Sequence, residues 1–160
     1  MKRHTALTIA ATAALCLGVS TFGSAIAQQF GTADDAKAML AKTVAALKAD
    51  KAKTLDLINK GEGFLDRDIY PFCFNKSDGV NQAVASPNAK QFLGKDIREN
   101  KDATGKQFGL DLYAAAQKPE GQITEVSYMF PKAGPDKTPV AKVSFVTAVG
   151  DLGCGVGYYK

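Results

Sequence analysis

The fold is decided by residues 66–75, which read Asp-Arg-Asp-Ile-Tyr-Pro-Phe-Cys-Phe-Asn. Both ends of this stretch are polar, and its middle is apolar at consecutive positions. A strand with one solvated face would alternate apolar and polar residues, so an unbroken apolar run indicates two buried faces. The turn signal Ser-Asp-Gly at 77–79 predicts a hairpin into a second strand at 80–85. We therefore expect residues 66–75 to form a central strand, with a core on one face and a different layer on the other.

A helical pattern precedes this strand. Thr32 can cap a helix, and Asp35 stands where a capping box places its acid. Apolar residues then recur on one face as far as Ile58, and Gly61 is a stop signal. The pattern predicts either one helix over 32–60 or two helices with a break near Asp50. Such a solvated helix is expected to pack on a sheet.

The chain after the hairpin continues with one helix and three strands. The helix is expected at 107–117, and the strands at 122–130, 140–149 and 152–159. Gly150-Asp151 predicts a tight turn between the last two strands. Because hairpins supply most of the sheet, the sequence predicts an α+β domain with an antiparallel sheet.

The first 27 residues have the organisation of a secretory signal peptide. A basic start at Lys2-Arg3 is followed by an apolar segment and by the small-x-small sequence Ala25-Ile26-Ala27. We predict cleavage after Ala27 and export to the periplasm or the exterior, which leaves a single domain at 28–160. An uncleaved membrane anchor is the alternative, although the apolar segment is short for a membrane span.

Composition excludes several classes of function. The net charge of +4 falls to about +2 without Lys2 and Arg3, which is too little to indicate nucleic-acid binding. His4, the only histidine, leaves with the signal peptide. The exported chain then lacks histidine for Ser-His or Cys-His catalysis and for metal binding. With no paired-carboxylate motif either, we expect no enzyme, no metal and no cofactor.

Two cysteines remain after cleavage, Cys73 and Cys154. They form no C-x-x-C motif, so thioredoxin-type chemistry is not indicated. An even number of cysteines in an exported protein indicates a disulfide. Two reduced, buried cysteines are the alternative.

Six short motifs in this order resemble the Cache domain family, specifically the single Cache domain of the second type, a PAS-like extracytoplasmic sensor domain. They are FLDRDIYPF (64–72), LGKD (93–96), DATGK (102–106), YMFP (128–131), KVSFV (142–146) and GVGYY (155–159). The resemblance covers residues 34–160. It implies a long N-terminal helix on a five- or six-stranded antiparallel sheet, whose other face forms a small-ligand pocket. It also implies neighbouring first and last strands, hence a Cys73–Cys154 disulfide that closes a loop of about 80 residues.

Ligands in this family are often small organic acids, and the domain usually feeds a membrane helix and a cytoplasmic output domain. This chain shows neither, so we expect a free-standing, exported form that signals through a membrane receptor or kinase partner. The family's usual histidine before the proline that ends the second strand is replaced by Ser86, and its usual tryptophan in the third strand by Ile123. Both departures change the expected pocket wall.

A small carboxylate requires a cation and neutral donors in a dry pocket. Lys142 lies within an apolar strand, where an unpaired ammonium group is costly, and alternation places it with Ser144 on one face. Arg67 can bind a carboxylate at the strand mouth, or form an ion pair with Asp66 or Asp68. For Lys142 and Tyr128 the alternatives are an edge lysine and a core tyrosine. The ligand-binding residues predicted in this way are Tyr70, Phe72, Ser86, Tyr128, Lys142 and Arg67.

Residues 100–111 faintly match a calcium-binding loop, but lysine stands between the ligand positions and no glutamate closes the loop. A polar turn before the second helix is the better interpretation. The leading functional hypothesis is an exported sensor module for a small organic acid. The alternative is an interaction protein whose pocket stays empty and which forms a homodimer through its N-terminal helix.

Overall fold

The computed structural model describes residues 30–160, so the predicted signal peptide lies outside the described residues. The N-terminal helical segment is two helices, α1 (Ala33–Ala49) and α2 (Lys51–Lys60). Thr32 and Asp35 form the predicted capping box of α1. Asp50 ends α1 in an extended conformation, and its side chain accepts a hydrogen bond from the Lys53 N–H to begin α2. The break predicted near Asp50 is therefore a cap shared by the two helices.

Five strands form one antiparallel sheet in the order β2-β1-β5-β4-β3. The strands are β1 (Pro71–Asn75), β2 (Asn81–Val84), β3 (Thr124–Pro131), β4 (Pro139–Val149) and β5 (Leu152–Tyr159). The 3₁₀ helices η1 (Pro87–Phe92) and η2 (Ile97–Glu99) and the helix α3 (Phe108–Ala116) lie between β2 and β3. The predicted α+β antiparallel architecture is confirmed.

The predicted strand at 66–75 is wrong in two respects. Asp66 and Ile69 exchange both of their backbone hydrogen bonds, and Arg67 between them has a φ of 56°, so these residues form a tight turn and β1 begins at Pro71. The strand is also not the central one, because β5 occupies the middle of the sheet and β1 lies between β5 and β2. A positive φ at a non-glycine residue is uncommon and has no sequence signal here.

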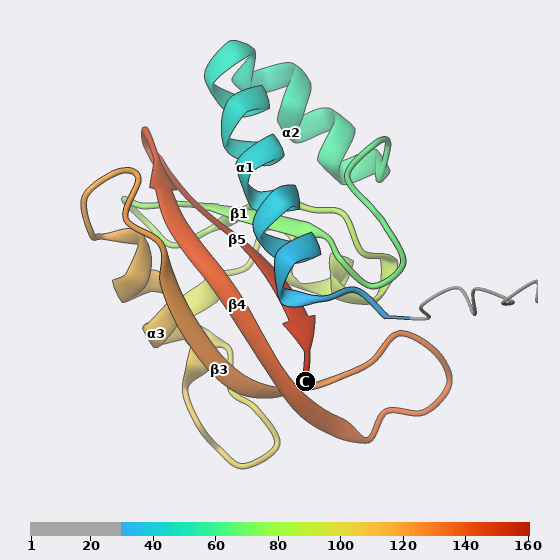
Figure 1. Ribbon diagram of the computed structural model, residues 1–160. Helices are drawn as coiled ribbons and strands as arrows, with labels where there is room; N and C mark the ends of the chain where they lie inside the picture. Colours follow the sequence, from blue (N-terminus) through green and yellow to red (C-terminus); the bar gives the residue numbers. More distant parts are fainter. Residues whose placement is uncertain (1–29) are drawn as a thin grey trace, which may run out of the picture.

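The two faces of the sheet meet different layers (Figure 1). Helices α1 and α2 cover one face, where Leu40 packs with Phe145 and Val156. On the other face, α3 packs with Phe74 and Val146. Cys73 and Cys154 are paired directly across β1 and β5, and their sulfur atoms form the predicted disulfide beneath α2. Among the described helices, none has the length and hydropathy of a membrane span.

Candidate functional site

Lys142 is buried on the α3 face of the sheet, with 3% of its surface exposed. Its Nζ donates a hydrogen bond to Tyr70 Oη at 3.2 Å. The same ammonium group lies 4.5 Å from the ring centre of Tyr70, 4.6 Å from that of Tyr159 and 5.2 Å from that of Phe130. Burial lowers the pKa of Lys142, and nearby Tyr128 and Asp68 offset part of the decrease. The aromatic faces replace some of the hydration that the ammonium group has lost.

Gly157 on β5 makes room for this lysine. A Cβ atom at residue 157 would lie 2.5 Å from Lys142 Cε and 2.6 Å from Ser144 Oγ, both closer than van der Waals contact. Gly155, two residues earlier on the same face, gives the same space to the ring of Phe72. Alternate glycines on the central strand therefore let large side chains from β1 and β4 lie flat across it.

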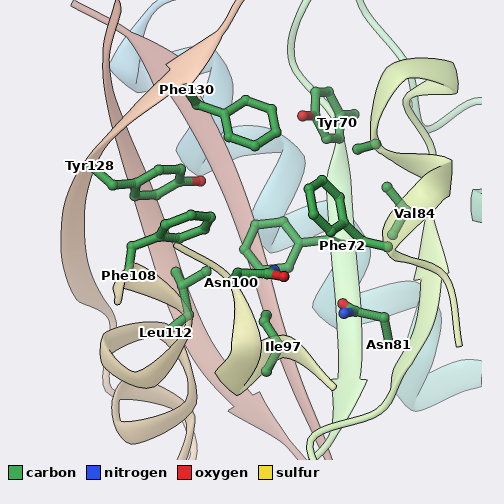
Figure 2. A pocket seen from close by; sticks show the side chains of 12 residues that line it. Tyr70, Phe72, Asn81, Val84, Ile97, Asn100, Phe108, Leu112, Tyr128 and Phe130 are labelled. Carbon is green, nitrogen blue, oxygen red and sulfur yellow. The ribbon is translucent and has the colours of Figure 1, made fainter. Parts of the chain in front are cut away.

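A small main cavity opens on this face between β1, β3 and α3. Its volume is about 40 Å³. Figure 2 shows Tyr128, Phe108 and Phe130 on one side and Tyr70, Val84 and Asn81 on the opposite side, with Phe72 between them. At ~10–15 Å³ for each water-sized group, the space suits about three or four non-hydrogen atoms. The full lining is Tyr70, Phe72, Asn81, Val84, Ala89, Phe92, Ile97, Asn100, Phe108, Leu112, Tyr128 and Phe130.

The polar groups of the main cavity are all neutral. Tyr70 accepts a hydrogen bond from Lys142 and, as a phenol, still carries a hydroxyl hydrogen of its own. Tyr128 Oη shares a 2.8 Å hydrogen bond with Ser144 Oγ, and its ring stacks on Phe108 with the centres 4.2 Å apart. Asn100 adds a side-chain amide to the same lining. Burial raises the pKa of Tyr70 to about 12, although Ser86 opposes the increase, and burial also raises the pKa of Tyr128. Both tyrosines are therefore protonated donors at neutral pH.

A second cavity of about 140 Å³ shares Tyr70 and Phe130 with the main one. It lies against Pro87 at the start of η1, the turn at 66–69 and the end of β5. Asp68 is the buried acid in its wall, with 7% of its surface exposed. The full lining is Leu65, Arg67, Asp68, Tyr70, Ser86, Pro87, Asn88, Phe130, Pro131, Ala133 and Tyr159.

Arg67 forms ion pairs at the rim of the second cavity. Its Nη2 lies 2.8 Å from Asp66 Oδ2 and 3.0 Å from Asp35 Oδ2. The pair with Asp66 is one of the two that the sequence favoured, whereas Asp68 is not a partner. Hydrogen bonding to Asp66 raises the pKa of Arg67, and Thr32 together with Arg67 lowers the pKa of Asp35.

The six predicted ligand-binding residues therefore fall into three places. Tyr70, Phe72 and Tyr128 line the main cavity, Tyr70 also lines the second cavity with Arg67 and Ser86, and Lys142 lies behind Tyr70. Four further lining residues, Asp68, Asn81, Asn100 and Tyr159, were not expected from the sequence. The asparagines precede or follow short turns, where polar residues are ordinary. Glycine stands at every second position from 153 to 157, directly before Tyr159. This alternation indicates that side chains of neighbouring strands cross the last strand, and it could have pointed to Tyr159.

In the loop at 100–111, the carboxylate of Asp102 accepts its hydrogen bonds from groups of the protein itself. Asp102 accepts hydrogen bonds from Thr104, from the Lys106 N–H and from the Met129 N–H of edge strand β3. These bonds lower the pKa of Asp102 to about 2, with Thr104 the largest contributor. Within residues 30–160, no cluster of three or more potential His, Cys, Asp or Glu ligands is arranged to hold a metal ion. The loop instead covers the exposed edge of the sheet.

Comparison with known proteins identifies relatives of this architecture. The family model described as Cache domain matches residues 34–160. The fold resembles a methyl-accepting chemotaxis protein from Vibrio parahaemolyticus RIMD 2210633 at 22% identity and a TM-score of 0.60, covering 79% of this chain and 86% of that one.

Two further solved structures are similar to this chain. One is the periplasmic sensor domain of a chemotaxis protein, at 21% identity and a TM-score of 0.56, covering 79% of this chain and 88% of that one. The other is described as a Cache chemosensory domain that recognises carboxylic acids, at 20% identity and a TM-score of 0.56, with coverages of 79% and 86%. No curated protein sequence matches this chain significantly. At these identities the structural likeness establishes the fold alone.

Proposed function

Because the chain belongs to the Cache domain family of sensor domains, we propose that it binds a small organic acid in the main cavity and passes that signal to a separate partner. The observation that carries this proposal is the buried ammonium group of Lys142, which donates a hydrogen bond to Tyr70, a phenol in the cavity wall.

The chemistry of the cavity suits an anion. A phenol that accepts a hydrogen bond from a cation becomes a stronger donor to a third group. The Tyr70 hydroxyl is therefore a charge-assisted donor in an apolar space, and the Asn100 amide adds a second donor. No acidic side chain lines this cavity among the described residues. The positive charge of Lys142 behind the wall would remain uncompensated by any anion inside the cavity until a carboxylate enters.

The size of the main cavity limits the ligand. Space for about three or four non-hydrogen atoms suits acetate, with a slightly larger acid such as propionate requiring a small movement of the rings. Ser86 and Arg67 lie in the neighbouring cavity, so they would contribute to ligand entry rather than to the carboxylate contact. The ion pairs of Arg67 with Asp66 and Asp35 would have to break before it could bind an acid directly.

The sequence and the disulfide support a place of action outside the cytoplasm. The signal-peptide pattern at 1–27 and the Cys73–Cys154 disulfide both suit an oxidising compartment. We propose that an exported domain of this kind acts through a membrane receptor or kinase partner.

A thermal-shift and calorimetry series tests the proposal. Propionate should raise the melting temperature of the exported chain, because a ligand at 100 times its Kd stabilises the folded state by about 2.7 kcal/mol. Propionamide, which has the same shape without the charge, should not. Lys142→Met should weaken propionate binding at least tenfold, whereas Lys106→Met, at an exposed lysine, should leave it unchanged. The proposal fails if no acid of two to four carbons binds, or if Lys142→Met binds propionate as the wild type does.

A groove along α1 favours a second candidate, an interaction domain that forms a homodimer. It is lined by Leu40 and Val44 of α1 together with Ile123, which is 53% exposed. A second copy packing here would cover this apolar surface. Light scattering of Ile123→Glu against the wild type distinguishes the cases: a monomeric wild type removes this candidate, and a dimer that Ile123→Glu dissociates supports it.

A further inference from the structure

Two aromatic rings separate the main cavity from the second cavity. Tyr70 and Phe130 line both spaces, and Figure 2 shows their rings at the same end of the main cavity. The ammonium group of Lys142 lies against both rings, 4.5 Å from the centre of Tyr70 and 5.2 Å from that of Phe130. The two rings are therefore neighbours, and together they form the wall between the cavities.

The two halves of this wall are held differently. Tyr70 is buried, with 8% of its surface exposed, and its hydroxyl accepts the hydrogen bond from Lys142. Phe130 is only partly buried and is the last residue but one of β3. Its ring meets Phe108 and Tyr128 edge-on, with the centres 6.3 and 6.1 Å apart. Phe130 is therefore the half of the wall that can be removed without breaking a hydrogen bond.

The second cavity suits the hydrocarbon chain of a ligand. Much of its lining is apolar, namely Leu65, Pro87, Pro131 and Ala133 beside the aromatic rings. The Oδ2 atom of Asp68 has less than 1 Å² of exposed surface, so it is not presented to the space. A volume of about 140 Å³ gives room for about ten non-hydrogen atoms, at ~10–15 Å³ for each. An alkyl chain needs no hydrogen-bond partner in such a space and gains from leaving water.

We propose that Phe130 sets the length of the acid that this domain binds. In the wild type its ring closes the main cavity, so that only an acid of two or three carbons fits. With a smaller side chain at this position, the carboxylate keeps its place beside Tyr70 and the chain of a longer acid passes into the second cavity. Each methylene group buried there raises the affinity about fourfold. The choice of an acid as ligand rests on the function proposed above, whereas the role of the ring as a partition does not.

The ratio of two affinities within one protein tests this inference. Isothermal titration calorimetry of the wild type should show propionate bound at least about tenfold more tightly than hexanoate, because the ring leaves no room for three further methylene groups. In Phe130→Ala the order should reverse, with hexanoate bound at least about tenfold more tightly than propionate. The ratio cancels any change in carboxylate affinity that follows from removing one of the rings around Lys142.

A second variant shows whether the gain comes from the second cavity. Ser86 is buried, with 5% of its surface exposed, and lines the second cavity but not the main one. Phe130→Ala/Ser86→Leu fills the opened space with a larger side chain and should return the ratio toward the wild-type value. A ratio that stays at the Phe130→Ala value would overturn the inference, because the alanine would then only have loosened the main cavity. Phe130→Val, with a side chain that suits a strand, replaces the alanine variant if that variant does not fold.

Neutral probes separate this inference from the acid site. The alcohols 1-propanol and 1-hexanol have the same chain lengths without the charge, and the rise in melting temperature measures their binding. Relative to 1-propanol, 1-hexanol should stabilise Phe130→Ala more than it stabilises the wild type. Where acids bind, an unchanged hexanoate ratio in Phe130→Ala overturns the inference and leaves the acid site intact. Where no acid binds, the proposed function fails and the hexanol ratio alone decides, since no gain in Phe130→Ala overturns the partition.

Discussion

Replacing Gly157 by alanine tests how the central strand positions Lys142. The new Cβ atom would lie 2.5 Å from Lys142 Cε and 2.6 Å from Ser144 Oγ, so we expect both side chains to shift and the hydrogen bond from Lys142 to Tyr70 to be lost. Loss of one hydrogen bond to a charged group costs about 1.5–3 kcal/mol. The lower entropy of alanine in the unfolded chain returns about 0.4–1 kcal/mol. We therefore expect the free energy of unfolding to fall by about 1–2 kcal/mol and propionate affinity to fall with it.

Urea unfolding of a double-mutant cycle measures this coupling. In a Lys142→Ala background the clash with Cε is absent, so Gly157→Ala should cost at least about 1 kcal/mol less than in the wild type. Gly155→Ala is the matched control on the same strand, because its Cβ atom meets the Phe72 ring and not the lysine. Its cost should be equal in both backgrounds. Equal costs of Gly157→Ala in the two backgrounds would refute the role given to Gly157.

Three further changes test other parts of the structure. The double variant Cys73→Ala/Cys154→Ala opens a loop with a sequence separation of 81 residues and should lower the free energy of unfolding by about 4 kcal/mol. Calorimetry should show a melting temperature lower by about 10–20 °C, and an unchanged melting temperature would contradict the disulfide. Burial raises the pKa of Tyr70 from 10.0 to about 12, so the stability that its protonated phenol contributes is fully present below pH 10 and is lost as the pH rises to 12. In urea unfolding at different pH values, Tyr70→Phe should reduce the loss of unfolding free energy between pH 10 and 12 by up to about 3 kcal/mol. Identical pH profiles for the variant and the wild type would contradict a buried phenol. Thr32→Ala removes the cap of α1 and should lower the free energy of unfolding by about 1 kcal/mol, whereas an unchanged value would show that the capping box contributes nothing.

Much of the architecture follows from local signals in the sequence. Thr32, Asp35 and Asp50 have the side chains that cap helices, and the structure uses all three as caps. The strands at 122–130, 140–149 and 152–159 are predicted to within two residues at each end because apolar periodicity and the Gly150-Asp151 turn mark them. The pairing of the first and last strands came from the resemblance to a family, since periodicity carries no information on which strands are neighbours.

The turn at 66–69 depends on contacts that local sequence patterns do not predict. Arg67 adopts a conformation that favours glycine, held by hydrogen bonds from Asp66 to Ile69 and by ion pairs with Asp66 and Asp35. Those ion pairs include one with a residue 32 positions away, so no local pattern predicts them. The same turn buries Asp68, which a strand pattern would have placed differently. Lys142 could be identified from the sequence because a lone ammonium group in an apolar strand requires a partner. That Tyr70 is this partner could not be predicted without knowing the strand order.

The central claim is that a small carboxylate binds in the main cavity within the field of Lys142. A crystal structure of the exported chain grown with propionate tests it most directly. We expect the carboxylate to lie in the main cavity and accept a hydrogen bond from Tyr70 Oη, which keeps its bond to Lys142 Nζ. Propionate found only in the second cavity, or bound without contact to Tyr70, would contradict the claim.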